Sequence, residues 1–205
     1  MLTYREIRGL TFGTIIHGAT GIVPYKIGDP AQKYYQPIRN SGIFVAPDMH
    51  LGYLKGIGPE LKALEDMLLE PEKLPVSTST HYIIAMHKKH NNKNYIVAVN
   101  SMPDTLKCTI SAKDMADGTY QVVGENRTIT VKNGKFTDSF DAHTAHIYTN
   151  DMSYKSPVDI PALEAEIKKL DTEALAALKN NPPAAPAAKK DTKKNAKKAK
   201  KSKKK

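Results

Sequence analysis

The chain contains no tryptophan and only one cysteine among its 205 residues. A single thiol, Cys108, cannot form an internal disulfide, so the cysteine content leaves the redox compartment open. The absence of tryptophan is unusual for a surface that binds sugars. No apolar run reaches about 18 residues, so we expect no transmembrane helix. The N-terminus also lacks the basic and apolar segments of a secretory signal.

An excess of positive charge is absent from most of the chain, although the formal net charge is +10. Residues 189–205 hold eleven of the 31 basic side chains and one of the 21 acidic ones, so the remainder is balanced. We expect the Lys/Ala-rich tail, residues 181–205, to be disordered, because it cannot bury enough apolar surface. Such a tail can bind a nonspecific anionic polymer by counterion release, but it lacks the aromatic residues that stack on bases.

The first 25 residues have the pattern of a helix followed by a buried strand. Thr3 and Glu6 have the spacing of a capping box, and Gly18 stands where a glycine ends a helix. The segment 19–25, "ATGIVPY", is short, apolar and partly β-branched, which predicts a buried strand. Pro24 has to lie at the end of that strand because it cannot donate to a ladder.

A second helical pattern follows a long irregular stretch. Residues 26–47 show no period and are long for a connection, which is a common property of functional loops. Asp48 is a suitable N-cap for the next helix. The apolar residues of this helix are spaced alternately three and four positions apart, and they are Leu54, Ile57, Leu61, Leu64 and Leu68. Gly58 and Pro59 are expected to kink this helix or divide it in two.

Beyond residue 74 the pattern changes to short β-rich runs. Seven of them follow at nearly regular spacing, at 81–86, 95–99, 105–110, 119–123, 128–131, 135–140 and 143–148. Asn133 and Gly134 lie between two of the runs and are a strong hairpin signal. The spacing predicts an antiparallel seven-strand β-sandwich. After residue 150 we expect a helix over 161–179 beginning at Pro161.

Several phrases of this sequence, in this order, resemble the C-terminal part of a (β/α)8-barrel glycoside hydrolase, in which the barrel is followed by a β-sandwich. "YREIRGLTFGTIIHGATGIVPYK" resembles the last barrel strand and the helix before it. "YIVAVNSMPDTLKCTI" and "NGKFTDSFDAHTAHIY" resemble segments of the sandwich. The resemblance covers roughly residues 3–150. None of these phrases is a catalytic signature.

The resemblance implies a mainly β fold in which the sandwich is preceded by a partial α/β segment, the end of a TIM barrel. Residues 1–73 would then be the barrel remnant and 74–150 the sandwich domain, with a linker and helix over 151–180 before the tail. We expect residues 1–73 to expose apolar surface that the missing barrel portion or another chain covers.

The resemblance also bears on catalysis. Glycosidases need two carboxylates beside the scissile bond, and barrel enzymes of this kind take them from earlier strands, near the fourth and the seventh. Those strands are absent from this sequence, so we do not expect the chain to hydrolyse glycosides by itself. Active sites of barrels lie at the C-terminal ends of the strands. Tyr25, Lys26, Tyr34 and Tyr35 fall at that end, and they are the predicted substrate-binding residues for a carbohydrate.

Other residue patterns favour structural roles. His143 and His146 are three apart, and on a strand such residues point to opposite faces, so they cannot share a metal. His87 and His90 have the same spacing but flank a lysine pair that would repel a cation. We therefore expect exposed histidines in turns. Asp138 and Asp141 are read as turn caps in preference to a calcium site. Cys108 is read as a small core residue. No phosphate-binding loop, dinucleotide glycine pattern or CxxC pair is present, so no metal or other cofactor is expected.

Two functional alternatives to a glycoside hydrolase fragment remain open at this point. The sandwich can be a non-catalytic carbohydrate-binding or structural module, with residues 1–70 as its helical cap. Alternatively, the lysine tail can make the chain a binder of anionic partners.

Overall fold

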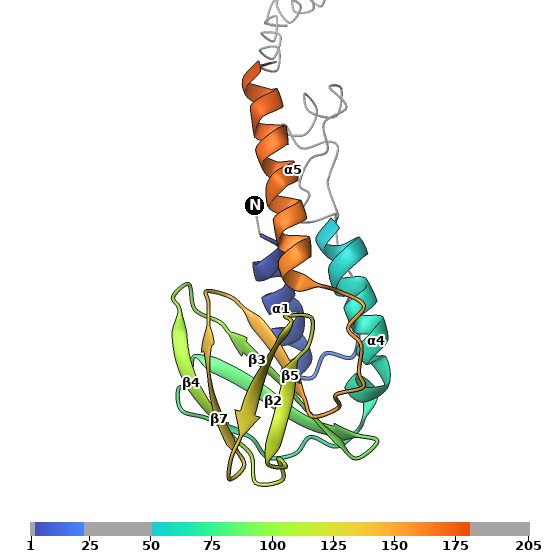
Figure 1. The fold of residues 1–205 in the computed structure, drawn as a ribbon, viewed down its shortest axis with the longest axis vertical. Coiled ribbons are helices and arrows are strands. Elements are labelled where there is room, and N and C mark those ends of the chain that lie inside the picture. The colour runs from blue at the N-terminus through green and yellow to red at the C-terminus, as the bar shows by residue number, and fades with distance from the viewer. Residues whose placement is uncertain (1–2, 23–50, 181–205) are drawn as a thin grey trace, which may run out of the picture.

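The strands of the protein form two antiparallel sheets, and the helices lie on one side of them (Figure 1). The structure is a computed structural model that describes residues 3–22 and 51–180. The larger sheet has five strands in the order β2-β3-β8-β5-β6, and the smaller has three in the order β1-β4-β7. The strands are β1 (Ser77–Thr78), β2 (Ile83–His90), β3 (Lys93–Asn100), β4 (Leu106–Ser111), β5 (Gly118–Val122), β6 (Arg127–Val131), β7 (Lys135–Phe140) and β8 (Ala145–Thr149).

The predicted fold class, a mainly β antiparallel sandwich with a C-terminal helix, is confirmed. The seven predicted runs correspond to β2 through β8, and β1 is a two-residue addition that pairs with β4. The turn at Asn133 and Gly134 has φ of 50° and 64°, as type I′ geometry requires. This turn carries the chain from β6 in one sheet to β7 in the other.

Strands β3 and β8 of the five-stranded sheet are buried on both faces. In β3, the side chains of Ile96 and Ala98 pack between the two sheets, whereas Val97 and Val99 pack against the helices. All five residues of β8 are buried as well. Continuous apolar runs such as "YIVAV" are the sequence pattern of strands covered on both sides. The molecule therefore has three layers, which are a small sheet, a large sheet and helices.

In the described residues, the helical layer consists of α1 (Tyr4–Ile16), the π-helix η1 (Gly52–Ile57), α4 (Gly58–Leu69) and α5 (Ile160–Asn180). The predicted capping box is present at the start of α1, where Thr3 and Glu6 exchange hydrogen bonds. At its end, the Gly18 amide donates to the Ile15 carbonyl and the Ala19 amide to the Thr14 carbonyl, which is a Schellman motif. No helix in the described part of the chain is both long and apolar enough to span a membrane.

The second helical segment is divided at Gly58, where the sequence predicts a break. The division is a change from π to α geometry. A π-helix has more residues per turn than the 3.6 of an α-helix. The side chains before Gly58 therefore point in other directions than an α-helical pattern predicts. Ile57 and Leu64 are buried as expected, but the side chain of Leu54 is 71% exposed. The predicted apolar stripe is therefore correct for α4 and wrong for Leu54.

The start of α5 packs against the other helices, which the sequence alone did not predict. Val158, Ile160, Leu163 and Ile167 form a buried cluster with Tyr4 and Ile7 of α1 and Ile57 of η1. Figure 1 shows α5 rising beside α1 and extending beyond the other elements. This cluster binds the segment after β8 to the first helix of the chain.

The described part of the predicted strand 19–25 differs from expectation. Residues 19–22 form no strand and pair with neither sheet. The rest of that segment and Asp48, the expected cap, lie outside the described residues. The preceding helix is also better packed than we expected of a barrel remnant, because Tyr4, Ile7 and Phe12 are at most 3% exposed.

Candidate functional site

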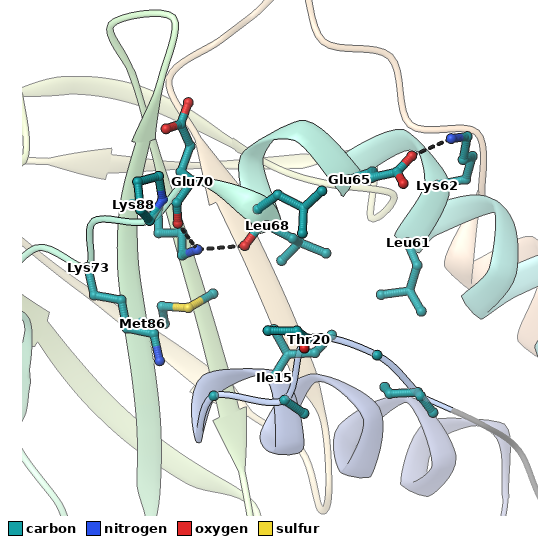
Figure 2. A pocket seen from close by; sticks show the side chains of 16 residues that line it. Ile15, Thr20, Leu61, Lys62, Glu65, Leu68, Glu70, Lys73, Met86 and Lys88 are labelled. Atoms are coloured by element: carbon teal, nitrogen blue, oxygen red, sulfur yellow. Dashed lines mark hydrogen bonds and ion pairs between the residues drawn. The ribbon is translucent and has the colours of Figure 1, made fainter.

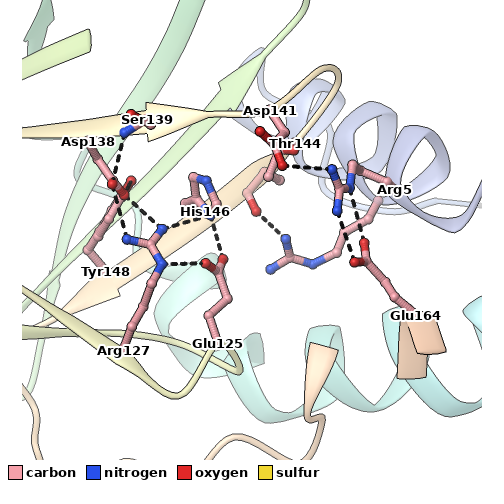
Figure 3. A network of polar contacts seen from close by, with 12 residues as sticks. Arg5, Glu125, Arg127, Asp138, Ser139, Asp141, Thr144, His146, Tyr148 and Glu164 are labelled. Atoms are coloured by element: carbon pink, nitrogen blue, oxygen red, sulfur yellow. Dashed lines mark hydrogen bonds and ion pairs between the residues drawn. The ribbon is translucent and has the colours of Figure 1, made fainter. Parts of the chain in front are cut away.

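The four predicted substrate-binding residues, Tyr25, Lys26, Tyr34 and Tyr35, lie outside the described residues, and their role stays a prediction. Two other places in the described chain bring polar side chains together. One is a half-buried network that joins the two sheets (Figure 3). The other is a groove between α1 and α4. Its lining includes Ile22, which is the last described residue before Tyr25 in the sequence.

The network between the sheets consists of Glu125, Arg127, Asp138, His146 and Tyr148, which we call the inter-sheet clasp. The guanidinium of Arg127 in β6 donates to both carboxylate oxygens of Asp138 in β7, at 3.1 and 2.8 Å. The hydroxyl of Tyr148 in β8 donates to the same carboxylate at 2.8 Å. Asp138 thus receives hydrogen bonds from two strands of the opposite sheet.

A second carboxylate completes the inter-sheet clasp. Glu125 lies in the turn between β5 and β6, where it accepts a hydrogen bond from Arg127 Nε at 2.9 Å. Its other oxygen lies 2.5 Å from Nδ1 of His146. Nε2 of His146 is buried and has no hydrogen-bond partner in the described structure. The ring packs against Phe140, with the two ring centroids 4.8 Å apart.

Strand alternation explains why these polar groups point inward. Asp138 shares its strand face with Phe136 and Phe140, and both phenylalanines belong to the core between the sheets. His146 shares its face with Tyr148, another residue of that core. The predictions that Asp138 caps a turn and that His146 is exposed are therefore wrong. The alternation in "KFTDSF" and "AHIY" was the signal that would have found them.

The electrostatics of the inter-sheet clasp favour its charged form. Burial raises the pKa of Asp138, but the hydrogen bonds from Arg127 and Tyr148 outweigh it and leave that pKa below its usual value. Burial likewise raises the pKa of Glu125, and the bond and charge of His146 together with Arg127 bring it below its usual value. Burial and the nearby Asp138 carboxylate raise the pKa of the Tyr148 phenol.

This chemistry suits a structural ion pair better than acid–base catalysis. A general acid in a glycosidase needs a carboxyl whose pKa is raised, so that it holds a proton near neutral pH. Both carboxylates of the clasp have lowered pKa values and share the Arg127 guanidinium. They are therefore ionised and already bound.

A second buried ion pair holds the helical layer together. Arg8 of α1 binds Glu60 of α4 through Nε at 2.9 Å and Nη2 at 2.6 Å, and both side chains are at most 4% exposed. Arg8 also donates to the carbonyl of Ala145 in β8. Burial lowers the pKa of Arg8, but the charge and the hydrogen bond of the Glu60 carboxylate raise it by more, so the pKa of Arg8 lies above its usual value. The pair connects α1, α4 and the large sheet at one point.

The remaining histidines are not arranged as a metal site in the described residues. His87 is fully buried and hydrogen-bonded to Asn94 at 2.8 Å, whereas His90 lies 2.8 Å from Glu70. The expectation of an exposed turn residue is therefore wrong for His87, and burial lowers its pKa. Within the described chain, no three His, Cys, Asp or Glu side chains are placed to hold a metal ion. The core position predicted for Cys108 is confirmed, since it is 1% exposed.

Comparison with known proteins gives structural neighbours only. No protein-family model and no curated protein sequence matches the chain. A GH30 endoxylanase from Clostridium papyrosolvens aligns over 35% of this chain and 20% of its own, with 18% identity and a TM-score of 0.31. An α-amylase from Geobacillus thermoleovorans, solved with acarbose, aligns over 50% and 23%, with 13% identity and a TM-score of 0.42. AmyP, solved with maltose, aligns over 54% and 20%, with 17% identity and a TM-score of 0.35.

The aligned region is therefore a small part of each neighbour. The chain spans about a fifth of the length of these glycoside hydrolases.

Proposed function

We propose that this chain is a non-catalytic, glycoside-hydrolase-like unit of carbohydrate metabolism that works beside a (β/α)8 barrel. The observation that carries the proposal is the position of the helices on either side of Tyr25 in the sequence. Helix α1 precedes Tyr25 and α4 follows it, and the buried Arg8–Glu60 pair ties them together against the large sheet. Consecutive units of a barrel place their helices side by side, which fits the resemblance of "HGATGIVPYK" to a last barrel strand.

The chemistry of the described carboxylates supports a non-catalytic role. Glu125 and Asp138 are fixed by Arg127 with lowered pKa values, and Glu60 is fixed by Arg8. A barrel supplied by a longer product or by another chain would bring the acid and the nucleophile or base that hydrolysis needs. Leu10, Leu54 and Leu69 of the helical layer are 58%, 71% and 61% exposed, and such a partner would cover them.

Calorimetric titration tests the proposal, with maltotriose as a probe for α-glucan and xylotriose as a probe for xylan. We expect one of the two to bind. Tyr25→Ala and the double variant Tyr34→Ala/Tyr35→Ala should weaken binding about five- to tenfold, because each removes an aromatic ring that stacks on a sugar. Lys26→Met should weaken it less, since a neutral sugar forms only a hydrogen bond with the amine.

Tyr82→Ala is the matched control, because Tyr82 is an exposed tyrosine before β2, outside the predicted site. It should leave the affinity unchanged. Sugar binding that is lost in Tyr82→Ala and kept in the Tyr25 variant would favour the alternative of a sandwich that binds carbohydrate by itself. Absence of any binding, or release of reducing sugar by the unmodified chain, would contradict the proposal.

A further inference from the structure

A groove of about 500 Å³ lies between the end of α1, the outer side of α4 and the edge strand β2 (Figure 2). We call it the helix groove. Its apolar lining comes from three elements, and includes Ile15 and Ile22 near the end of α1, Leu61 and Leu68 of α4, and Met86 of β2. Its size falls within the range of small-molecule sites.

Two lysines stand in the wall of the helix groove, and among the residues that the structure describes neither has a carboxylate partner. Lys88, which is 5% exposed, donates from Nζ to the carbonyls of Leu68 and Glu70 at the end of α4. Lys73 donates from Nζ to the carbonyl of Ile16 at 3.0 Å. Each ammonium group has three donors, so both lysines can accept a further partner. Capping the carbonyls at the end of α4 uses two of the three donors of Lys88 and leaves the third for a ligand.

The carboxylates of the helix groove are already bound to other groups. The carboxylate of Glu65 is held by Lys62 at the rim, and that of Glu70 lies 2.8 Å from Nδ1 of His90. Figure 2 shows the ammonium of Lys88 turned towards the end of α4, with Lys73 on the same side of the groove as Met86. Burial and the charge of Lys73 lower the pKa of Lys88, and the carboxylate of Glu70 opposes this shift without reversing it.

We propose that the helix groove binds a single-chain carboxylate amphiphile, with the alkyl chain along the apolar lining and the carboxylate on Lys73 and Lys88. An apolar lining with cations at one side is complementary to such a ligand in both shape and charge. A neutral sugar would leave the aliphatic lining without an apolar partner. This inference is independent of the proposed carbohydrate function.

Fluorescence displacement tests the inference on the full chain, with 11-(dansylamino)undecanoate as the bound probe. Dodecanoate below its micelle concentration should displace the probe. Dodecanol should compete at least about tenfold more weakly, because it lacks the charge-assisted bonds. Dodecyltrimethylammonium should not compete because its charge is opposite, and butyrate should not compete because it lacks the chain that fills the lining.

Three variants separate the helix groove from adventitious attraction. Lys73→Met should weaken dodecanoate about tenfold and leave dodecanol unchanged, whereas Lys107→Met, which alters an exposed lysine of β4 outside the groove, should change neither. Gly21→Trp should abolish probe binding, since a Cβ at Gly21 meets open space and the indole would fill the groove. Its thermal unfolding should match that of the unmodified protein.

The inference is overturned by failure of dodecanoate to displace the probe, by equal competition from dodecanol, or by full binding in Gly21→Trp. Displacement by maltotriose would overturn it too, since the groove would then be a sugar site. Self-association that Gly21→Trp abolishes would identify a second copy as the occupant and would also overturn it. None of these results depends on whether the Tyr25 variants alter sugar binding, so the two proposals fail separately.

Discussion

Gly9 is the residue at which α1 comes closest to the turn between β7 and β8. A Cβ built at Gly9 falls far inside van der Waals distance of the carbonyl oxygen of His143. That oxygen belongs to backbone held by a bond from the His143 amide to Met102. Glycine is therefore needed here for close packing, although a glycine inside a helix lowers the stability of that helix relative to alanine.

Gly9→Ala should lower the free energy of unfolding by about 2 kcal/mol, because the clash outweighs the gain in helix propensity. The matched control is Gly13→Ala, one turn later in α1. A Cβ there meets only a side-chain methyl of Ile84 at 3.8 Å, which is ordinary contact. Gly13→Ala should raise the free energy of unfolding by about 0.5–1 kcal/mol. Urea titration followed by circular dichroism measures both, and changes of the same sign would contradict the argument.

Single residues differ in how far the sequence predicts them. Thr3, Glu6 and Gly18 were predictable because capping is local and depends on residues a few positions apart. Asp138 and His146 were not predicted, because their partners lie on other strands and only the three-dimensional pairing brings Arg127 to them. Their inward position could have been read from strand alternation, but not the identity of their partners.

Among the elements, the inter-sheet clasp connects the two sheets by polar bonds, in addition to the apolar packing between them. It joins β6 and β8 of the large sheet to β7 of the small one through Asp138. Half-buried ion pairs of this kind stabilise when all members are satisfied, and removal of one partner leaves the others uncompensated.

Asp138→Asn should lower the free energy of unfolding by about 2 kcal/mol at pH 7. The pKa of Asp138 is lower in the folded state than its ordinary value of 3.8. Its contribution is therefore complete above that ordinary value and is lost as the pH falls through the folded pKa. The difference in unfolding free energy between the unmodified protein and Asp138→Asn should shrink below about pH 4, which urea titrations at a series of pH values measure.

Tyr148→Phe provides the comparison, because it removes one donor and keeps the Arg127 pair. It should cost about 1 kcal/mol at pH 7. The difference in unfolding free energy between the unmodified protein and Asp138→Asn could also stay constant from pH 7 to pH 3. That result would show that the clasp does not stabilise the Asp138 carboxylate.

The elements themselves were largely predictable where the period is local. The strands and the division at Gly58 follow from alternation, turn residues and proline. The exposure of Leu54 was not predictable, because the change from α to π geometry alters the phase of the helix without a sequence signal that we recognise. The absence of a strand over 19–22 has a related cause. An apolar β-branched run needs a neighbouring strand to pair with, and composition does not supply that neighbour.

At the scale of the whole molecule, α5 closes the helical layer through the cluster of Ile160, Leu163 and Ile167 with α1 and η1. Arg5 reinforces the contact with two bonds to Glu164, at 3.1 and 3.0 Å. The sequence predicted a helix over 161–179 beginning at Pro161, and the observed helix is Ile160–Asn180. Its docking site was not predictable, because it consists of residues about 100 to 160 positions earlier.

Two truncations separate the roles of α5 and the lysine tail. A chain that ends at Asp159 should lose about 4 kcal/mol or more of unfolding free energy, because Tyr4, Ile7 and Ile57 lose their apolar cover. A chain that ends at Asn180 should keep its stability but elute from a heparin column at much lower salt, since it lacks the lysines that release counterions. Equal stability of the two truncated chains, or unchanged heparin retention, would contradict these assignments.

The contact between α1 and α5 has a mechanical consequence. Tension applied to these two helices in an optical trap would load the Arg5–Glu164 bonds and the Tyr4–Leu163 packing directly. We therefore expect the helices to peel apart in an early, low-force step, and the sandwich to rupture later as a separate event.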